Sequence, residues 1–264
     1  MKNILAVLIL IPALALAAAP AKAPPQVPGV DWTAKTIKAT GKGSPAMNAP
    51  SVAAARIGAE KAAEMDAIRN ILATLKGIQV TSEKTVGDTM SASADVSAKL
   101  EGEAKGFKRV NTRYFSDGGV EIDVEMSIEG LLAELEAGEP KAVEAAKLPA
   151  VGDAKNTGLV VDASGLHPKP ALAPRLVDEA GKEVYSQAVV APAALKANGI
   201  AGYLKKLDEA KKSSRVGERP LIVKALRLSG ASDLVIANAD AEKLRDPKGN
   251  VSYLGEGRVI IVAE

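Results

Sequence analysis

The sequence predicts an α+β fold, in which a long helix packs on an antiparallel sheet and a second small α/β or α+β domain follows. Residues 120–128 alternate apolar and polar side chains, as in a strand with one buried face. Residues 52–76 repeat apolar or small side chains at spacings of three and four, as in a helix with one buried face. Beyond residue 157, short apolar runs alternate with helical segments, which favours a separate domain.

The N-terminus has the pattern of a secretory signal peptide. Lys2 precedes an apolar run from Ile4 to Leu16, and Ala15-Leu16-Ala17 has the small residues of a cleavage site. The run is too short for a confident membrane span. We therefore expect a signal peptide at 1–17, an Ala/Pro-rich tether at 18–30 and domains at 31–148 and 157–264. The protein is expected in the periplasm.

Composition narrows the function classes. The chain has no cysteine, so it has neither disulfides nor an acylated lipobox cysteine. Its formal charge of +2 becomes +1 when Lys2 leaves with the signal, which argues against a nucleic-acid partner. We expect membrane association that is at most peripheral. Aromatic residues make up only 3% of the chain, too few to suggest a stacking platform for bases or sugars.

The first domain is predicted to begin with a short strand from Trp32 to Ala39, followed by a loop marked by glycines and prolines from Gly41 to Pro50. Ser51 is a suitable N-cap for a helix over Val52–Lys76, which ends at Gly77. The predicted core stripe of this helix is Gly58, Ala62, Met65, Ile68, Leu72 and Leu75.

The next segments are predicted as a strand over Ile78–Val86 and a weak helix over Asp88–Leu100. A hairpin follows, with Ser116-Asp117-Gly118 as its loop and Gly118 in the left-handed conformation. A helix over Gly130–Lys147, interrupted by Pro140, closes the domain. In the predicted hairpin register Tyr114 faces Val120, Thr112 faces Ile122, Val110 faces Val124, Arg113 faces Glu121 and Arg109 faces Glu125.

The second domain is predicted from apolar runs, turn residues and caps. A turn at Asp178–Gly181 should join two of its strands, and Asn238 should cap a short helix that ends at Arg245. Ile200–Lys212 is predicted to be a helix that ends in a basic run. The predicted strands are Gly158–Asp162, Leu172–Val177, Glu183–Val190, Leu221–Leu228, Leu234–Ala237 and Arg258–Val262.

The segment from Trp32 to Gly130, about two-fifths of the chain, carries a resemblance in the order and spacing of several short motifs. These are Ala39-x-Gly41-x-Gly43, Ala54-Ala55-Arg56, Ala62-Ala63-x-x-Asp66-Ala67-x-Arg69-Asn70-x-Leu72, Lys76-Gly77-Ile78-x-Val80, Thr85-Val86-x-Asp88, Tyr114-x-x-Asp117-Gly118 and Val120-Glu121-x-x-Val124-x-Met126. The segment resembles the module shared by the Lpp-twenty outer-membrane lipoprotein family and the N-terminal domain of flagellar assembly protein T. The resemblance implies an envelope protein without known enzymatic activity, connected in some members with flagellar assembly. Unlike the lipoprotein members, this chain has no cysteine to acylate.

No residue is assigned a catalytic, cofactor-binding or metal-binding role. The single histidine, His167, lies in a proline-punctuated run and is expected in an exposed loop. Gly41-Lys42-Gly43-Ser44 lacks the spacing of a phosphate-binding loop. Two clusters of charged residues remain. An acidic row is better explained by cross-strand ion pairs than by calcium binding, and it consists of Asp117, Glu121, Asp123 and Glu125. A basic run is better explained by a solvated helix face than by a lipid-binding site, and it consists of Lys205, Lys206, Lys211, Lys212 and Arg215.

The sequence therefore favours an exported, non-enzymatic cell-envelope protein that needs no cofactor and acts by binding other envelope proteins, in the flagellar or outer-membrane assembly that the resemblance implies. Self-association stays open. The alternative is a periplasmic hydrolase or small-ligand-binding protein whose site lies in the second domain. Exposed sheet edges, the flank of the Val52–Lys76 helix and the Ala/Pro-rich tether are the expected means of binding a partner.

Overall fold

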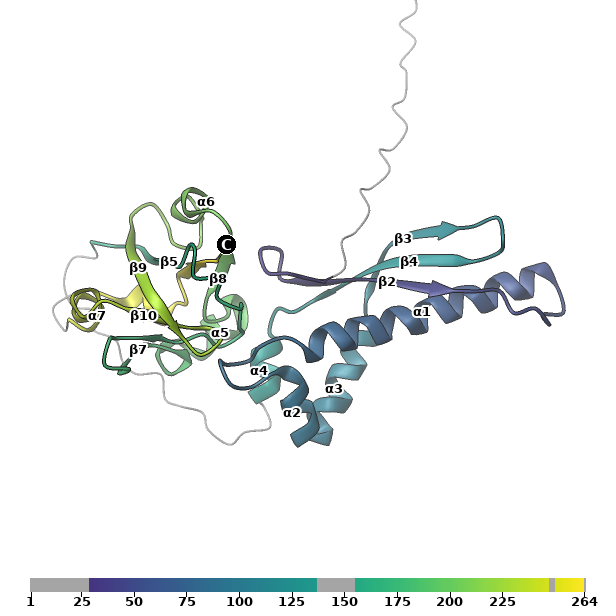
Figure 1. The fold of residues 1–264 in the computed structure, drawn as a ribbon, viewed down its shortest axis with the longest axis horizontal. Helices are drawn as coiled ribbons and strands as arrows, with labels where there is room; N and C mark the ends of the chain where they lie inside the picture. Colours follow the sequence, from purple (N-terminus) through teal and green to yellow (C-terminus); the bar gives the residue numbers. More distant parts are fainter. Residues whose placement is uncertain (1–28, 137–154, 247–249, 264) are drawn as a thin grey trace, which may run out of the picture.

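The computed structural model describes residues 29–136, 155–246 and 250–263. They form two units, each built around its own sheet (Figure 1). The predicted α+β fold class is confirmed. The predicted signal peptide and residues 18–28 of the predicted tether lie outside the described residues, and residues 29 and 30 belong to a strand.

The sheet of the first unit is antiparallel and has four strands in the order β1-β2-β4-β3. The strand predicted from Trp32 to Ala39 is wrong at both ends. Trp32 lies in the turn between β1 and β2, and β2 continues through Gly41 and Gly43, which were expected in a loop. The strands are β1 (Gly29–Asp31), β2 (Thr36–Gly43), β3 (Lys108–Tyr114) and β4 (Val120–Ser127).

The two glycines belong in β2 because helix α1 (Val52–Lys76) lies directly against them. A Cβ atom on Gly41 would lie 2.0 Å from the carbonyl oxygen of Ala63, and one on Gly43 would lie 1.9 Å from that of Ala59. Only glycine leaves room for the helix backbone at these positions.

Helix α1 has the predicted bounds, and the Ser51 side chain caps it by accepting a hydrogen bond of 3.1 Å from the Ala54 amide. The predicted core stripe is right only in part, because the helix is rotated relative to it: Leu75 is buried and Ile68 and Leu72 pack against the core, whereas Gly58, Ala62 and Met65 are exposed. Gly58 faces open space and Met65 is 66% exposed. Close backbone approach favours alanine on the contact face, and the buried stripe is Ala59, Ala63, Ala67, Ile71 and Leu75.

No strand forms over Ile78–Val86, contrary to prediction. The backbone amides of Val80 and Thr81 both donate to the carbonyl oxygen of Lys84, at 2.8 and 3.1 Å, so the chain turns here. Thr85 then begins a helix through a capping box with Asp88.

The weak helix predicted over Asp88–Leu100 is two helices, α2 (Val86–Ala92) and α3 (Ala94–Lys105), which lie with α1 on one side of the sheet (Figure 1). Helix α4 (Leu131–Glu136) is the described part of the helix predicted over Gly130–Lys147. Pro140 lies outside the described residues.

The hairpin has the predicted loop and, near the loop, the predicted register. The amide of Phe115 donates to the carbonyl oxygen of Gly119 at 3.0 Å, and Gly118 has a φ of 84°. The three predicted pairs that form are Tyr114 with Val120, Arg113 with Glu121 and Thr112 with Ile122.

A β-bulge at Val110 changes the register beyond this point. Arg109 lies opposite Val124, and Lys108 lies opposite Glu125. The predicted pairs Val110–Val124 and Arg109–Glu125 are therefore wrong. The bulge brings Arg109 to the helix side of the sheet, where it pairs with Glu64 of α1.

The second unit contains a mixed seven-stranded sheet in the order β7-β6-β10-β9-β5-β11-β8. Strands β9, β5, β11 and β8 are parallel neighbours, β10 is antiparallel to β9 and parallel to β6, and β7 is antiparallel to β6. The strands are β5 (Gly158–Asp162), β6 (Leu176–Val177), β7 (Glu183–Tyr185), β8 (Gly202–Leu204), β9 (Pro220–Ser229), β10 (Asp233–Ile236) and β11 (Val259–Val262).

All six strands predicted here are present, although β6 and β7 are shorter than expected, and the turn at Asp178–Gly181 is confirmed. The helix predicted over Ile200–Lys212 is wrong: Gly202–Leu204 pairs with β11, and only Leu207–Lys211 is helical. Asn238 begins its helix but does not cap it, because its side-chain oxygen accepts a hydrogen bond from the Glu179 amide. The helices are the 3-10 helix η1 (Gln187–Val189), α5 (Pro192–Asn198), α6 (Leu207–Lys211), α7 (Asn238–Arg245) and α8 (Ser252–Gly255).

Candidate functional site

We first located the residues that the sequence had singled out. His167 is exposed in a loop, as predicted, with a left-handed φ of 49°. Gly41, Lys42 and Gly43 lie in β2, so they do not form a loop that cradles phosphate. Within the described ranges, no group of three or more His, Cys, Asp or Glu side chains could hold a metal ion.

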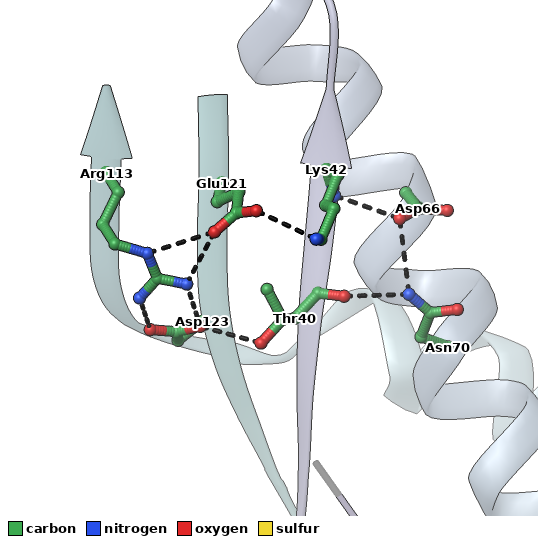
Figure 2. Close-up of polar contacts among 7 residues, drawn as sticks. All are labelled: Thr40, Lys42, Asp66, Asn70, Arg113, Glu121 and Asp123. Atoms are coloured by element: carbon green, nitrogen blue, oxygen red, sulfur yellow. Dashed lines mark hydrogen bonds and ion pairs between the residues drawn. The ribbon is translucent and has the colours of Figure 1, made fainter. Parts of the chain in front are cut away.

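Two members of the acidic row, Glu121 and Asp123 of β4, form an ion-pair network with neighbouring strands (Figure 2). The Arg113 guanidinium donates to Glu121, at 3.1 Å, and also to Asp123. Lys42 pairs with the other oxygen of Glu121 at 3.1 Å. The Thr40 hydroxyl donates to Asp123 at 2.8 Å. These contacts are cross-strand ion pairs of the kind that the sequence favoured over a calcium site.

The network keeps its carboxyl groups ionised. Asp123 is 1% exposed, and burial alone would raise its pKa; hydrogen bonds from Arg113, Thr40 and Asn111 outweigh burial and hold the pKa below its usual value. The hydrogen bond from Lys42, with help from Arg113, likewise lowers the pKa of Glu121. A lowered pKa is the opposite of what a general acid requires.

Strand β1 pairs with β2 only over residues 36–38, so the rest of this edge of β2 has no strand beside it. Helix α1 covers part of this edge. The Asn70 side chain donates to the carbonyl oxygen of Thr40 at 2.8 Å, and the Asp66 carboxylate accepts a hydrogen bond of 3.0 Å from the Lys42 amide (Figure 2). This part of β2 cannot accept a partner strand without losing those bonds. Strand β3, by contrast, is an edge strand, because β4 is its one strand neighbour in the described sheet.

In the described residues the two units contact each other between α4 and α5 and at two further places. The first is main-chain pairing of residues 79 and 80 with residues 171–173, in which the Ala173 amide donates to the Val80 carbonyl oxygen at 2.7 Å. Beside it, the Ser82 hydroxyl accepts hydrogen bonds from the amides of Ser232 and Asp233. The second is the β1–β2 turn, where the Trp32 ring lies edge-on to Tyr203 with centroids 5.3 Å apart.

A cleft of about 520 Å³ lies at this second contact and is lined by both units. The first unit contributes Trp32, Thr33 and Lys35. The second contributes Asn198, Gly202, Tyr203, Leu204, Ser213, Ser214, Arg215, Glu256, Arg258 and Ile260. The lining residues include three cationic side chains and one carboxylate, so the cleft is not lined by a pair of carboxylates.

Arg215 is the residue in the cleft that the sequence analysis misjudged. It belongs to the basic run that was interpreted as a solvated helix face, but it lies after α6 and its side chain turns inward across Gly202. Its terminal nitrogens donate to the carbonyl oxygens of Asn198 at 2.7 Å and Gly199 at 3.1 Å. Burial lowers the pKa of Arg215, since removing the charge from water disfavours it.

A different feature stands out at the end of the first unit far from the second unit (Figure 1). There the start of α1, the end of β2 and the hairpin loop meet: Arg56 lies over the Tyr114 ring, 5.4 Å from its centroid, and Tyr114 donates a hydrogen bond to Glu60. We call the exposed apolar side chains at this end the distal patch: Met47 (105% exposed), Val52 (82%), Ile57 (58%), Tyr114 (52%) and Phe115 (44%).

Comparison with known proteins adds one similarity. A family model for the second domain of Treponema pallidum Tp0624 matches residues 158–264. The match begins at the first residue of β5, so it covers the second unit and about two-fifths of the chain. No curated protein matches the chain. In the described residues, no helix is both long and apolar enough to cross a membrane.

Proposed function

We propose that this chain is an exported, non-enzymatic cell-envelope protein that binds another protein through the distal patch. The observation that carries the proposal is that five exposed apolar side chains belong to the start of α1, the segment before it and the β3–β4 hairpin loop, all at the same end of the first unit (Figure 1). Isolated apolar side chains are normal on protein surfaces, whereas several of them at one end of a molecule favour an interaction site. Tyr and Phe are also typical anchors of protein interfaces.

The contacts at this end support a preformed binding surface. Tyr114 is held by Glu60 at 2.9 Å and by the Arg56 guanidinium, so its ring is already oriented. Pro45 lies against the hairpin loop, where a Cβ on Gly118 would be 3.3 Å from its ring. A surface that is rigid before binding loses little conformational entropy when a partner docks.

The cellular setting of the proposal comes from the sequence. The signal-peptide pattern at 1–17 supports export to the periplasm, and the resemblance of residues 32–130 to the Lpp-twenty and flagellar assembly protein T module supports a role in flagellar or outer-membrane assembly. We propose envelope proteins as its partners.

The test is site-specific photo-cross-linking in the cells that make the protein. A photoreactive amino acid at Met47 or Phe115 should give the same covalent adduct with one envelope protein, identified by mass spectrometry. The matched control is Ile222 on β9, which is also apolar and is 46% exposed but lies in the second unit. Phe115→Ser should weaken the purified complex by roughly tenfold, as expected for an aromatic anchor.

Two outcomes would contradict the proposal. One is the absence of an adduct from both distal positions. The other is the same adduct from Ile222, because the contact would then not depend on the distal patch.

A further inference from the structure

We propose that the cleft between the two units binds a small molecule that carries a carboxylate or phosphate group beside an apolar group, with Arg215 and Lys35 holding the anion. This proposal is independent of the distal patch, because it concerns the other end of the first unit.

The first argument is the convergence of charge. Arg215 donates to the carbonyl oxygen of Asn198 at 2.7 Å, and the Lys35 ammonium contacts the same oxygen at 3.4 Å, so the two cationic groups meet at one point in the cleft. Arg258 is adjacent, since its Nε donates to the main-chain oxygen of Arg215 at 3.2 Å. Three cations therefore lie around a cleft to which Glu256 contributes the one lining carboxylate.

The second argument is that the charge of Arg215 is incompletely compensated. Lys35 pairs with Glu129 at 3.5 Å and Arg258 with Glu256 at 3.6 Å, but no described carboxylate lies within ion-pair distance of Arg215. Its Nε is inaccessible to solvent and has no hydrogen-bond partner. An inward-facing cation without a counter-ion is unfavourable, and an anion bound at its terminal nitrogens would relieve that cost.

Capping of helix α5 is the simpler role for Arg215, because Asn198 and Gly199 end that helix. Capping does not use all the hydrogen-bond donors of the Arg215 side chain. The two bonds use one N–H from each terminal nitrogen, and each of these nitrogens has a second N–H. These remaining N–H donors can bond the oxygens of a carboxylate or phosphate.

The third argument is the size and lining of the cleft. Its volume of about 520 Å³ falls in the range of small-molecule sites, roughly 300–1,000 Å³, and greatly exceeds that of a bare anion. Trp32, Leu204 and Ile260 supply apolar surface near the cations. The favoured ligand is therefore an anionic group attached to an apolar body.

Trp32 is the single tryptophan of the chain and lines the cleft, so its fluorescence reports on this site. The mature full-length protein would be titrated with benzoate, with phenyl phosphate and with neutral benzamide at constant ionic strength. The first two probes distinguish a carboxylate ligand from a phosphate ligand. Benzamide has nearly the shape of benzoate but carries no charge. We expect a saturable change with at least one anion and none with benzamide.

Arg215→Gln should weaken anion binding at least tenfold, because a hydrogen bond to a charged group is lost. Arg227→Gln, an exposed arginine on β9, is the matched control and should bind like the wild type. If Arg215→Gln fails to fold, Lys35→Gln replaces it and should weaken binding severalfold. The proposal is overturned if neither anion gives a saturable change, if benzamide binds equally well, or if the folded variants bind like the wild type.

Discussion

The contact between β2 and α1 offers the sharpest test of how this fold is held together. A methyl group added by Gly41→Ala would lie 2.0 Å from the carbonyl oxygen of Ala63, 2.5 Å from the amide nitrogen of Ala67 and 2.7 Å from its Cβ. The nearest two atoms belong to the helix backbone, so rotation of a side chain cannot relieve the clash. The helix as a whole would have to move away from the sheet.

The expected effect is large. Overpacking of a core costs about 1–3 kcal/mol, and a clash with rigid backbone belongs at or above the top of that range, so Gly41→Ala should reduce the free energy of unfolding by about 3 kcal/mol or more. Gly58→Ala is the matched control. Gly58 lies in α1 with nothing within 4 Å of its added Cβ, and alanine is a better helix former by about 1 kcal/mol.

The same substitution should therefore have opposite signs at the two positions, with a difference of about 4 kcal/mol, or roughly a thousandfold in the unfolding equilibrium. Urea unfolding followed by Trp32 fluorescence measures both variants, because Trp32 lies in the β1–β2 turn. The double variant Gly41→Ala/Ala67→Gly should not recover the loss, because the Ala63 oxygen remains. A neutral Gly41→Ala would show that the helix does not contact the strand through its backbone.

Two further predictions concern the ion pairs. Asp123→Asn should reduce the free energy of unfolding by about 2–3 kcal/mol at pH 7, because hydrogen bonds to a buried charge are lost. The pKa of Asp123 is lowered in the folded state, so the ionised side chain stabilises the fold above about pH 4, and this stabilisation is lost as the pH falls through the folded-state pKa. The difference in unfolding free energy between Asp123→Asn and the wild type, measured by urea unfolding, should therefore be smaller at pH 3 than at pH 7. In double-mutant cycles, Arg109 should couple to Glu64 by about 0.2–1 kcal/mol, as exposed pairs do, whereas Arg109 and Glu125 should be additive. Coupling to Glu125 alone would contradict the bulge at Val110.

Features encoded by local sequence could be predicted. The bounds of α1 follow from Ser51 and Gly77, which act within one turn of the helix. The hairpin near Gly118 follows from a turn residue beside an alternating strand, and both signals are local. The same reasoning found all six predicted strands of the second unit, because each is an apolar run bounded by polar or turn residues.

Features that depend on contacts between distant segments could not be predicted. Gly41 and Gly43 suggested a loop, and their place in a strand is explained only by Ala59 and Ala63 of the packed helix. Gly202–Leu204 was predicted as part of a helix over Ile200–Lys212, and pairing with β11, about sixty residues later, makes it a strand. The bulge at Val110 leaves no clear mark in the alternation of β3, although it decides which carboxylate Arg109 meets.

The cleft escaped sequence analysis for the same reason. Its cations come from the β1–β2 turn, from the loop after α6 and from the residue before β11, and nothing in the chain order brings Lys35, Arg215 and Arg258 together. The sequence signal that existed was a basic run, and it was ambiguous because most such runs are solvated. Within the basic run, Arg215 is the residue that packs over Gly202 and donates hydrogen bonds to the carbonyl groups at the end of α5.

The two proposed sites lie at opposite ends of the first unit, and this separation bears on how the protein can work. Helix α1, with 25 residues, is about 37 Å long, and it begins at the distal patch and ends beside the second unit (Figure 1). A small ligand in the cleft therefore cannot contact a partner bound at the distal patch. Any influence of one on the other would have to pass through the sheet and α1, whose backbone contact at Gly41 and Gly43 leaves little freedom to slide. The first unit thus fits a rigid spacer that holds a partner at a fixed distance from the ligand-binding junction.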